Sequence, residues 1–394
     1  MTSTTHDTGR LVRDAATWFG YLLVSIQIYF FTVQGNVIPF LQTEFSLNYS
    51  TVALHSAAMA AGVVIIGLAG ARIVGAFGRR RTLLLAACGL AGGGILLCIS
   101  PGPWASIPSC LIIGLAGGIS SSNVPAMMAD IHGERRAQAI TEQSIFAYTF
   151  AILGPIITGI CVANGLGWRT AVFAGATVGI ALIAVFHWVH IPQSVSAAQP
   201  RGSHAPLPAA FWAYWVLFAF AIGMEFATLL WAPAFLERVI GFSAAAAATA
   251  AAGFFLGVLS GRLVVRAIVR RFNPRHILLV AYAIGIAGFI AYWAIGTKAS
   301  AIAGIFMLGL GVAPQYPMIM SLGIGAARGA NDAGATRMVL AFGLSFLLAP
   351  VALGALADRV GLGPAHLTLA VLLGGAVVSL LVAMSLERRA ASPV

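Results

Sequence analysis

The stretch Phe220–Pro233 reads FAIGMEFATLLWAP and places one glutamate, Glu225, inside an apolar run. The run belongs to a longer apolar window, residues 211–235, and about 20 such residues cross a bilayer as a helix. A carboxylate near the bilayer centre costs roughly 2.5–3.5 kcal/mol on insertion scales, so acidic residues there usually face a cavity or a partner. The stretch therefore predicts a membrane-spanning helix that carries one acidic group of functional interest.

The whole chain shares this character. Of its 394 residues, 60% are hydrophobic and only 8% are charged, against roughly 45–50% and 25% in soluble domains. Its net charge of +11 comes from basic residues in short gaps between apolar windows, a pattern of membrane orientation and not of nucleic-acid binding. The four cysteines lie within or at the ends of apolar windows and have no CxxC spacing, which indicates packing roles. We therefore expect an integral membrane protein.

Twelve apolar windows are long enough to span a bilayer. The first is too long for the apolar region of a signal peptide and has no small-residue cleavage site. The fold we expect is an all-α membrane protein with twelve transmembrane helices in two six-helix bundles. The windows are residues 17–41, 51–73, 82–100, 104–128, 138–163, 170–191, 211–235, 244–266, 276–296, 300–325, 335–357 and 364–386.

The basic residues predict the orientation of these spans. Of the 22 Lys and Arg residues, only Arg169, Arg238, Lys298 and Arg359 fall on the side opposite to the two termini. Because cytoplasmic loops carry the excess of Lys and Arg, both termini are expected in the cytoplasm. The expected location is the cell inner (plasma) membrane, crossed many times.

A polar segment rich in Pro, Ser and Gly divides the spans six and six. Such a composition favours a linker over a helix. The expected domains are an N-terminal bundle (1–192), a cytoplasmic linker (193–210) and a C-terminal bundle (211–394).

A weak internal repeat supports two related halves. Gly114 and Gly309 lie in similar glycine-rich stretches 195 residues apart, and the same offset aligns Pro155 with Pro350. Two parallel six-helix repeats with a binding site near the bilayer midplane are the plan of one large class of secondary transporters.

Three local motifs give the chain a family resemblance. ARIVGAFGRRRTLLL (residues 71–85) resembles the signature loop of the major facilitator superfamily: Gly78, Arg79 and Arg80 match its end, whereas Ala71 and Gly75 stand where the family has Gly and Asp. GPIITG (154–159) is similar to a shortened Gly-Pro motif of the family's proton-driven exporters, and GLGWRTAVF (165–173) resembles a common junction before the sixth span.

The resemblance covers essentially the whole chain. It implies two bundles that rock about a central cavity, lined mainly by the first and fourth helices of each half. It does not imply a substrate, because this fold serves many.

The candidates for proton or cation coupling are Glu225 and His55. Glu225 shares a helix face with the small residues Ala221 and Thr228, which suits a wet interior where a carboxyl group exchanges a proton. The alternative for Glu225 is a structural partner of a nearby amide or hydroxyl. His55 lies in the outer third of the second window and is either a packing residue or a proton shuttle.

Polar and amphipathic residues within other windows are candidates for the substrate cavity. Pro314 and Pro317 interrupt the tenth window, and a broken helix at mid-membrane is a pointer to a binding site. Amides and serines in such helices also serve only to hold neighbouring helices together, so a packing role stays open for these candidates. They are Gln27, Gln34, Asn123, Tyr148, Gln315 and Tyr316.

Basic residues within the windows (Arg72, Arg262, Arg266 and Arg337) all fall near cytoplasmic ends. Carboxylates and phosphates are usually held by Arg, so a lone buried carboxylate favours a neutral or cationic, partly apolar substrate. The basic loops are expected to anchor the inner side, with Asp130 or Asp332 as acidic partners. The sequence shows no metal-ligand cluster, nucleophile arrangement or phosphate-binding loop, so we expect no cofactor, no metal and no enzymatic activity.

We therefore expect a monomeric, proton-coupled secondary transporter that exports a small hydrophobic or cationic compound, with the substrate, protons and the lipid bilayer as its partners and no nucleic acid. The first alternative is a proton-coupled or facilitative uptake carrier for a neutral or weakly charged metabolite. The second is a non-transporting membrane sensor.

Overall fold

The computed structural model describes residues 12–132, 136–191, 207–268, 271–327 and 331–391. Within these ranges every element of regular secondary structure is an α-helix. Their bounds are α1 (Ala15–Glu44), α2 (Tyr49–Phe77), α3 (Arg79–Ile99), α4 (Pro103–His132), α5 (Arg136–Ala163), α6 (Trp168–Phe186), α7 (Ala209–Arg238), α8 (Ala244–Ala250), α9 (Ala252–Ile268), α10 (Pro274–Trp293), α11 (Lys298–Val312), α12 (Gln315–Ala326), α13 (Asn331–Val360), α14 (Leu362–Ala365) and α15 (Leu367–Ala391).

The described residues contain twelve segments that are long and apolar enough to cross a membrane. Each predicted window corresponds to one of them, so the number of spans is confirmed. Three spans consist of two consecutive helices: α8 with α9, α11 with α12, and α14 with α15.

Polar residues cap the starts of several spans, which is why these apolar helices begin where they do. Asp14 accepts a hydrogen bond from the Thr17 backbone N–H at 2.8 Å, and Asn48 accepts one from Thr51 at 2.8 Å. Each cap satisfies one of the backbone donors that a helix leaves free in its first turn.

The predicted break in the tenth span is confirmed. Helix α11 ends at Val312 and α12 begins at Gln315, with Pro314 between them. Proline has no backbone N–H and its ring obstructs the preceding turn, so the hydrogen-bond ladder stops there. The second proline, Pro317, is accommodated in the first turn of α12.

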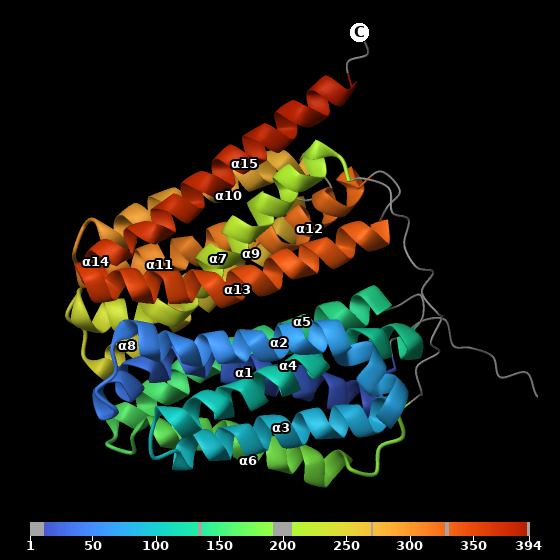
Figure 1. The fold of residues 1–394 in the computed structure, drawn as a ribbon, viewed down its shortest axis with the longest axis vertical. Coiled ribbons are helices and arrows are strands. Elements are labelled where there is room, and N and C mark those ends of the chain that lie inside the picture. Colours follow the sequence, from blue (N-terminus) through green and yellow to red (C-terminus); the bar gives the residue numbers. More distant parts are fainter. Residues whose placement is uncertain (1–11, 133–135, 192–206, 269–270, 328–330, 392–394) are drawn as a thin grey trace, which may run out of the picture.

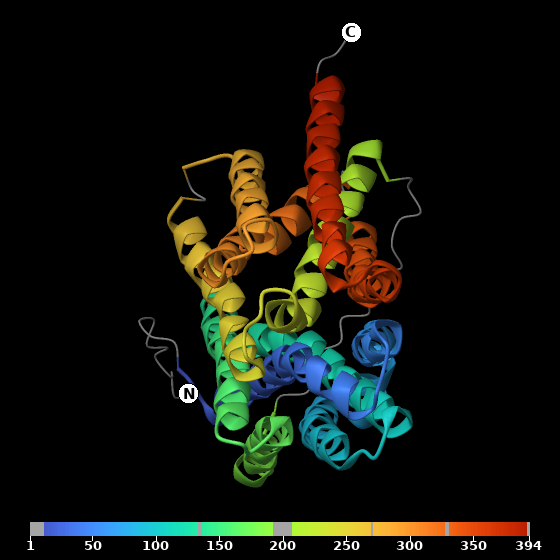
Figure 2. The ribbon, with the colours of Figure 1, turned by 90° about the vertical axis from the view of Figure 1, so that its left-hand side faces the viewer.

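The helices form two groups, α1–α6 and α7–α15, which lie one below the other in Figure 1. Contacts between the groups run from α2 to α13, from α1 to α7, and from α5 to α8 and α9. Figure 2 shows yellow α8 against green α5 where the groups meet. Most of the predicted linker lies outside the described residues.

The two groups repeat one packing pattern. Gly114 on α4 lies so close to the Met59 backbone of α2 that a Cβ there would overlap it, and Gly309 on α11 has the same relation to the Phe254 backbone of α9. Met59 and Phe254 are 195 residues apart, the offset that the sequence repeat has. The aligned glycines are therefore matching helix crossings, where the absence of a side chain permits close approach.

Candidate functional site

The centre of the candidate site is Glu225, halfway along α7. Its side chain is partly exposed, whereas its neighbours Met224, Ala227 and Thr228 are buried. No described residue is within hydrogen-bonding or ion-pairing distance of its carboxyl group, but the charge of Arg262 interacts with it electrostatically. The carboxyl group therefore has no fixed partner among the described residues, and Arg262 of α9 is the charge that acts on it.

Arg262 belongs to the site although sequence analysis placed it at a cytoplasmic end. Its guanidinium carbon lies 4.3 Å from the centre of the Tyr148 ring, so it joins α9 of one helix group to α5 of the other. A helical side chain tilts toward the N-terminus of its own helix. Because α9 begins on the predicted outer side, this tilt carries the Arg262 head group toward mid-membrane. Arg262 therefore reaches the interface between the two helix groups, a position that its place near the end of its window did not indicate.

A signal for Arg262 was present in the sequence. The residue stands inside the run SGRLVVRAI, and a charge within an apolar run was the same criterion that selected Glu225. Its distance from the window centre concealed it, since a long side chain extends well beyond its own backbone position.

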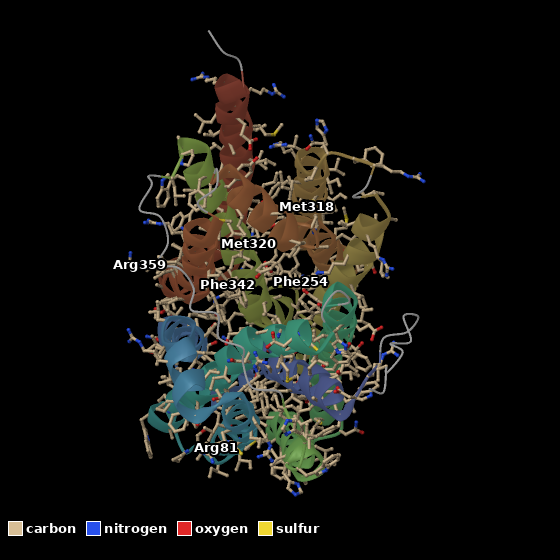
Figure 3. The ribbon with its side chains drawn as sticks, turned by 90° about the vertical axis from the view of Figure 1, so that its right-hand side faces the viewer. Arg81, Phe254, Met318, Met320, Phe342 and Arg359 are labelled. Atoms are coloured by element: carbon tan, nitrogen blue, oxygen red, sulfur yellow. The ribbon has the colours of Figure 1, made fainter. Side chains whose placement is uncertain are left out.

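An aromatic cluster adjoins these charges. The Tyr316 ring lies 5.6 Å from Phe218 and 6.1 Å from Phe342, and Phe342 lies 5.6 Å from Phe226. Phe226 in turn stacks on Phe346 at 3.9 Å. Figure 3 shows Phe342 at the level where the two helix groups meet. We define the aromatic cluster as Phe218, Phe226, Tyr316, Phe342 and Phe346.

Tyr148 and Tyr316 connect the cluster to the charged groups. Both side chains interact electrostatically with Glu225 and with Arg262. Tyr316 stays 41% exposed in spite of its ring contacts. The structure thus brings together three sequence candidates, Glu225, Tyr148 and Tyr316, with Arg262 added.

The candidate amides differ in their surroundings. Gln34 lines a small pocket with Phe31, Ser56, Phe226 and Phe346, next to the aromatic cluster.

Gln315 and Gln27 are buried, and the side-chain oxygen of each lacks a hydrogen-bond partner. The Gln315 amide donates to the Gly311 carbonyl at 2.9 Å, and the Gln27 amide donates to Ser121 Oγ at 2.6 Å. Asn123 donates to the Ile119 carbonyl of its own helix at 3.0 Å. A role for these three residues in substrate binding stays a prediction.

His55 lies within the N-terminal helix group and is fully buried. Its Nδ1 pairs with the Val52 carbonyl at 2.9 Å and its Nε2 with Ser106 Oγ at 2.8 Å. Both ring nitrogens thus have partners on α2 and α4, and the structure records no interaction between His55 and Glu225. Its part in coupling stays a prediction.

The signature loop is held within the N-terminal helix group. Gly78 ends α2 with φ 76°, a conformation that suits glycine. Arg79 pairs with Asp130 at 2.6 Å, and Arg80 donates to the carbonyls of Val189 and His187. Asp130 is thus a partner of the basic loop, as expected, whereas the Asp332 side chain lies outside the described residues.

Polar contacts join the two helix groups at the ends that the sequence predicts to face outward. Asp358 on α13 accepts hydrogen bonds from the backbone N–H groups of Tyr49 and Ser50 at 2.7 and 2.8 Å, and also from the Ser50 hydroxyl. Arg238 on α7 donates to Gln42 at 2.6 Å. We call these five residues the outer contact; sequence analysis missed it, because its partners are far apart in the chain.

Among the described residues, no group of three or more His, Cys, Asp or Glu side chains could hold a metal ion. The site can therefore be described as one carboxyl group, one guanidinium group, two phenols and an apolar aromatic wall. Such a set can bind a small organic molecule and exchange a proton.

Comparisons with known proteins agree with the fold. The sequence model of the Major Facilitator Superfamily matches residues 17–336. The gallate transporter of Pseudomonas putida is 22% identical over 400 residues, covering 91% of this chain and 84% of the relative. The cyanate transport protein CynX of Escherichia coli (strain K12) is 24% identical over 302 residues, covering 74% and 76%.

Solved structures show the same architecture. A bacterial homolog of the human lysosomal transporter Spinster, in an inward-facing and unoccupied conformation, superposes with a TM-score of 0.74 at 15% identity, covering 96% of this chain and 99% of that one. At this identity the match establishes the fold alone.

Proposed function

The chain belongs to the major facilitator superfamily of membrane transporters, and from this premise we propose that it is a proton-coupled secondary transporter in which Glu225 carries the proton. The observation that supports the proposal most is the unpaired carboxyl group of Glu225 in the middle of α7. A structural carboxylate at this depth would be expected to have a hydrogen-bonding partner, because leaving one charged and unpaired is costly.

Alternating access gives the unpaired carboxyl group a use. When the two helix groups close over the site, water leaves and a charged carboxylate becomes more costly. Protonation removes that cost, so the closed state forms more readily with the proton bound. Once the site opens to the side of lower proton concentration, the proton leaves.

The outer contact supports a conformational cycle of this kind. Asp358 and Arg238 join the groups on the predicted outer side, so opening toward that side requires these bonds to break. We assign the outer contact as the outer gate.

The proposed substrate differs in charge from the hydrophobic or cationic compound that the sequence favours. Arg262 is positive and acts electrostatically on Glu225, so a cation at this site would meet repulsion as well as attraction. Two relatives are named as transporters of gallate and cyanate, and both of these compounds are anions. We therefore propose a neutral or anionic metabolite, which is closest to the alternative of an uptake carrier.

The direction of transport is a separate part of the proposal. Export was expected from the shortened Gly-Pro motif, Gly154–Gly159. In the structure Gly154 lies against Thr32 of α1 and Gly159 against Thr249 of α8, and both contacts have a plain packing explanation. We therefore propose uptake coupled to proton entry, with export as the alternative.

The test is proton movement in proteoliposomes that contain a pH-sensitive dye. The compounds added are 3,4,5-trihydroxybenzoate, D-xylose and tetraphenylphosphonium, an anion, a neutral sugar and a lipophilic cation. We expect protons to enter the liposomes when the anion or the sugar is added. In Glu225→Gln this proton entry should be lost. The variant should still exchange labelled for unlabelled compound. Proton entry in Glu225→Gln at the wild-type rate would refute the proposal, and proton exit on addition of the cation would favour export.

A further inference from the structure

We infer that Arg262 and the aromatic cluster bind an aromatic carboxylate, with the carboxylate on the guanidinium group and the ring against the cluster. This inference rests on the proposed transport function and specifies its substrate class.

The first observation is that Arg262 has no acceptor. None of the described residues accepts a hydrogen bond from it, and its Nε is buried without a partner. Other arginines have carboxylate partners: Arg169 pairs with Glu44 at 2.5 Å and Arg275 with Glu387 at 2.7 Å. A guanidinium group has five donors in a planar fork that fits a carboxylate. The N–H donors of Arg262 therefore have no acceptor among the residues described, and an anionic group of a ligand would supply one.

The second observation is aromatic surface next to this cation. Tyr316 is 41% exposed, and Phe226 and Phe342 are half-buried. Arg262 acts electrostatically on Tyr316, and Tyr316 contacts Phe342, so the rings lie within electrostatic range of the charge. Aromatic side chains favour stacked or edge-on contact with another ring. A planar ring attached to a carboxylate satisfies both features.

The position of Glu225 makes binding depend on its protonation. A charged Glu225 competes with the substrate carboxylate for Arg262 and repels it, whereas a protonated Glu225 does neither. Arg262 from α9 acts electrostatically on Glu225, and a charged Glu225 in turn acts on Tyr148 of α5 and Tyr316 of α12. No charged group described on α1, α13 or α15, which also pack on α7, interacts with it. Proton and substrate then bind together and cross together.

The test measures binding of benzoate, 4-hydroxybenzoate and 3,4,5-trihydroxybenzoate to the purified full-length protein by isothermal titration calorimetry at pH 6 and pH 8. Benzamide has the ring without the charge, and cyclohexanecarboxylate has the charge without the aromatic ring. We expect at least one benzoate to bind at least tenfold more tightly than either control compound, and more tightly at pH 6 than at pH 8.

The variants are Arg262→Gln and Arg262→Lys, with Arg266→Gln as the matched control. Arg266 lies one turn further along α9 and is exposed. We expect at least a tenfold loss of benzoate binding in Arg262→Gln, a smaller loss in Arg262→Lys because charge remains without the fork, and none in Arg266→Gln. An unfolding temperature equal to wild type in the absence of ligand shows that the variant is folded.

The outcomes separate this inference from the proposed function. Absence of benzoate binding, or binding that Arg262→Gln leaves unchanged, overturns the inference, and the transport proposal stands if another compound still drives Glu225-dependent proton entry. If a benzoate binds through Arg262 but Glu225→Gln leaves its proton-coupled uptake intact, the inference stands and the proposed proton carrier is wrong.

Discussion

The outer contact and the central site are both polar regions between the two helix groups, but the polar groups are paired in the first and unpaired in the second. At the outer contact, Asp358 accepts from two backbone N–H groups and a hydroxyl, and Arg238 donates to Gln42. At the central site, Glu225 and the Nε of Arg262 lack hydrogen-bond partners. Paired groups stabilise one arrangement of the helices, whereas unpaired groups cost stability and stay available to ligands.

The largest effect is expected when the unpaired charge at the central site is removed. Glu225→Gln should raise the stability of the detergent-purified protein by about 1–3 kcal/mol at pH 8, because it removes an unpaired charge from an apolar setting, although proton-coupled transport is lost. The gain should shrink at pH 5, where the wild-type carboxyl group is protonated more often. Thermal unfolding at both pH values measures it. A loss of stability at pH 8 would mean that Glu225 has a structural partner.

The next effect concerns the outer contact. Asp358→Asn should weaken the contacts with the start of α2 and raise the outward-open population about tenfold, which corresponds to about 1.4 kcal/mol. The readout is labelling of Ser56→Cys by an impermeant maleimide added outside, in a protein without the native cysteines. Ser56 is buried beside Gln34 in the structure.

The control for this labelling is Arg359→Gln, because the adjacent Arg359 is exposed and no described residue bonds to it. Equal labelling of Asp358→Asn and the control would show that the outer contact does not hold the gate closed.

A smaller effect is expected at His55. His55→Gln should lower the stability by about 1 kcal/mol, because at least one of its two hydrogen bonds is lost. Proton-coupled transport should stay at the wild-type level per folded molecule. Stability from thermal unfolding and proton entry in liposomes are compared on the same preparation, and uncoupled transport would restore His55 as a proton carrier.

The smallest effect is expected far from both regions. Arg13 lies before α1 and pairs with Glu142 at 2.8 Å, and this carboxylate raises the pKa of the guanidinium group. The arginine side chain is open to solvent, so the pair contributes little. Arg13→Gln should leave the unfolding temperature and transport nearly unchanged. A clear loss of transport would extend the functional region to this pair.

Much of the fold could be predicted, because each span is a local pattern. The twelve windows follow from about 20 apolar residues each, the break at Pro314 from the missing N–H, and the aligned glycines Gly114 and Gly309 from an internal offset. The site was predicted in part: Glu225, Tyr148 and Tyr316 were selected because each is polar within an apolar run. Arg262 was not among the candidates, because its backbone lies near the end of its window, whereas its side chain reaches Tyr148 of the other helix group.

The sequence by itself determined which segments span the membrane, the orientation expected from the Lys and Arg residues, and the presence of an acidic group at mid-helix. The tertiary structure decided which polar groups meet. Helical periodicity places residues on a face of one helix, but the rotation and tilt of that helix against its neighbours come from packing. Packing brought Arg262 beside Tyr148 and near Glu225, and it paired Asp358 with a helix start 308 residues away. Contacts between distant segments depend on the packing of all the helices, and no local pattern contains them.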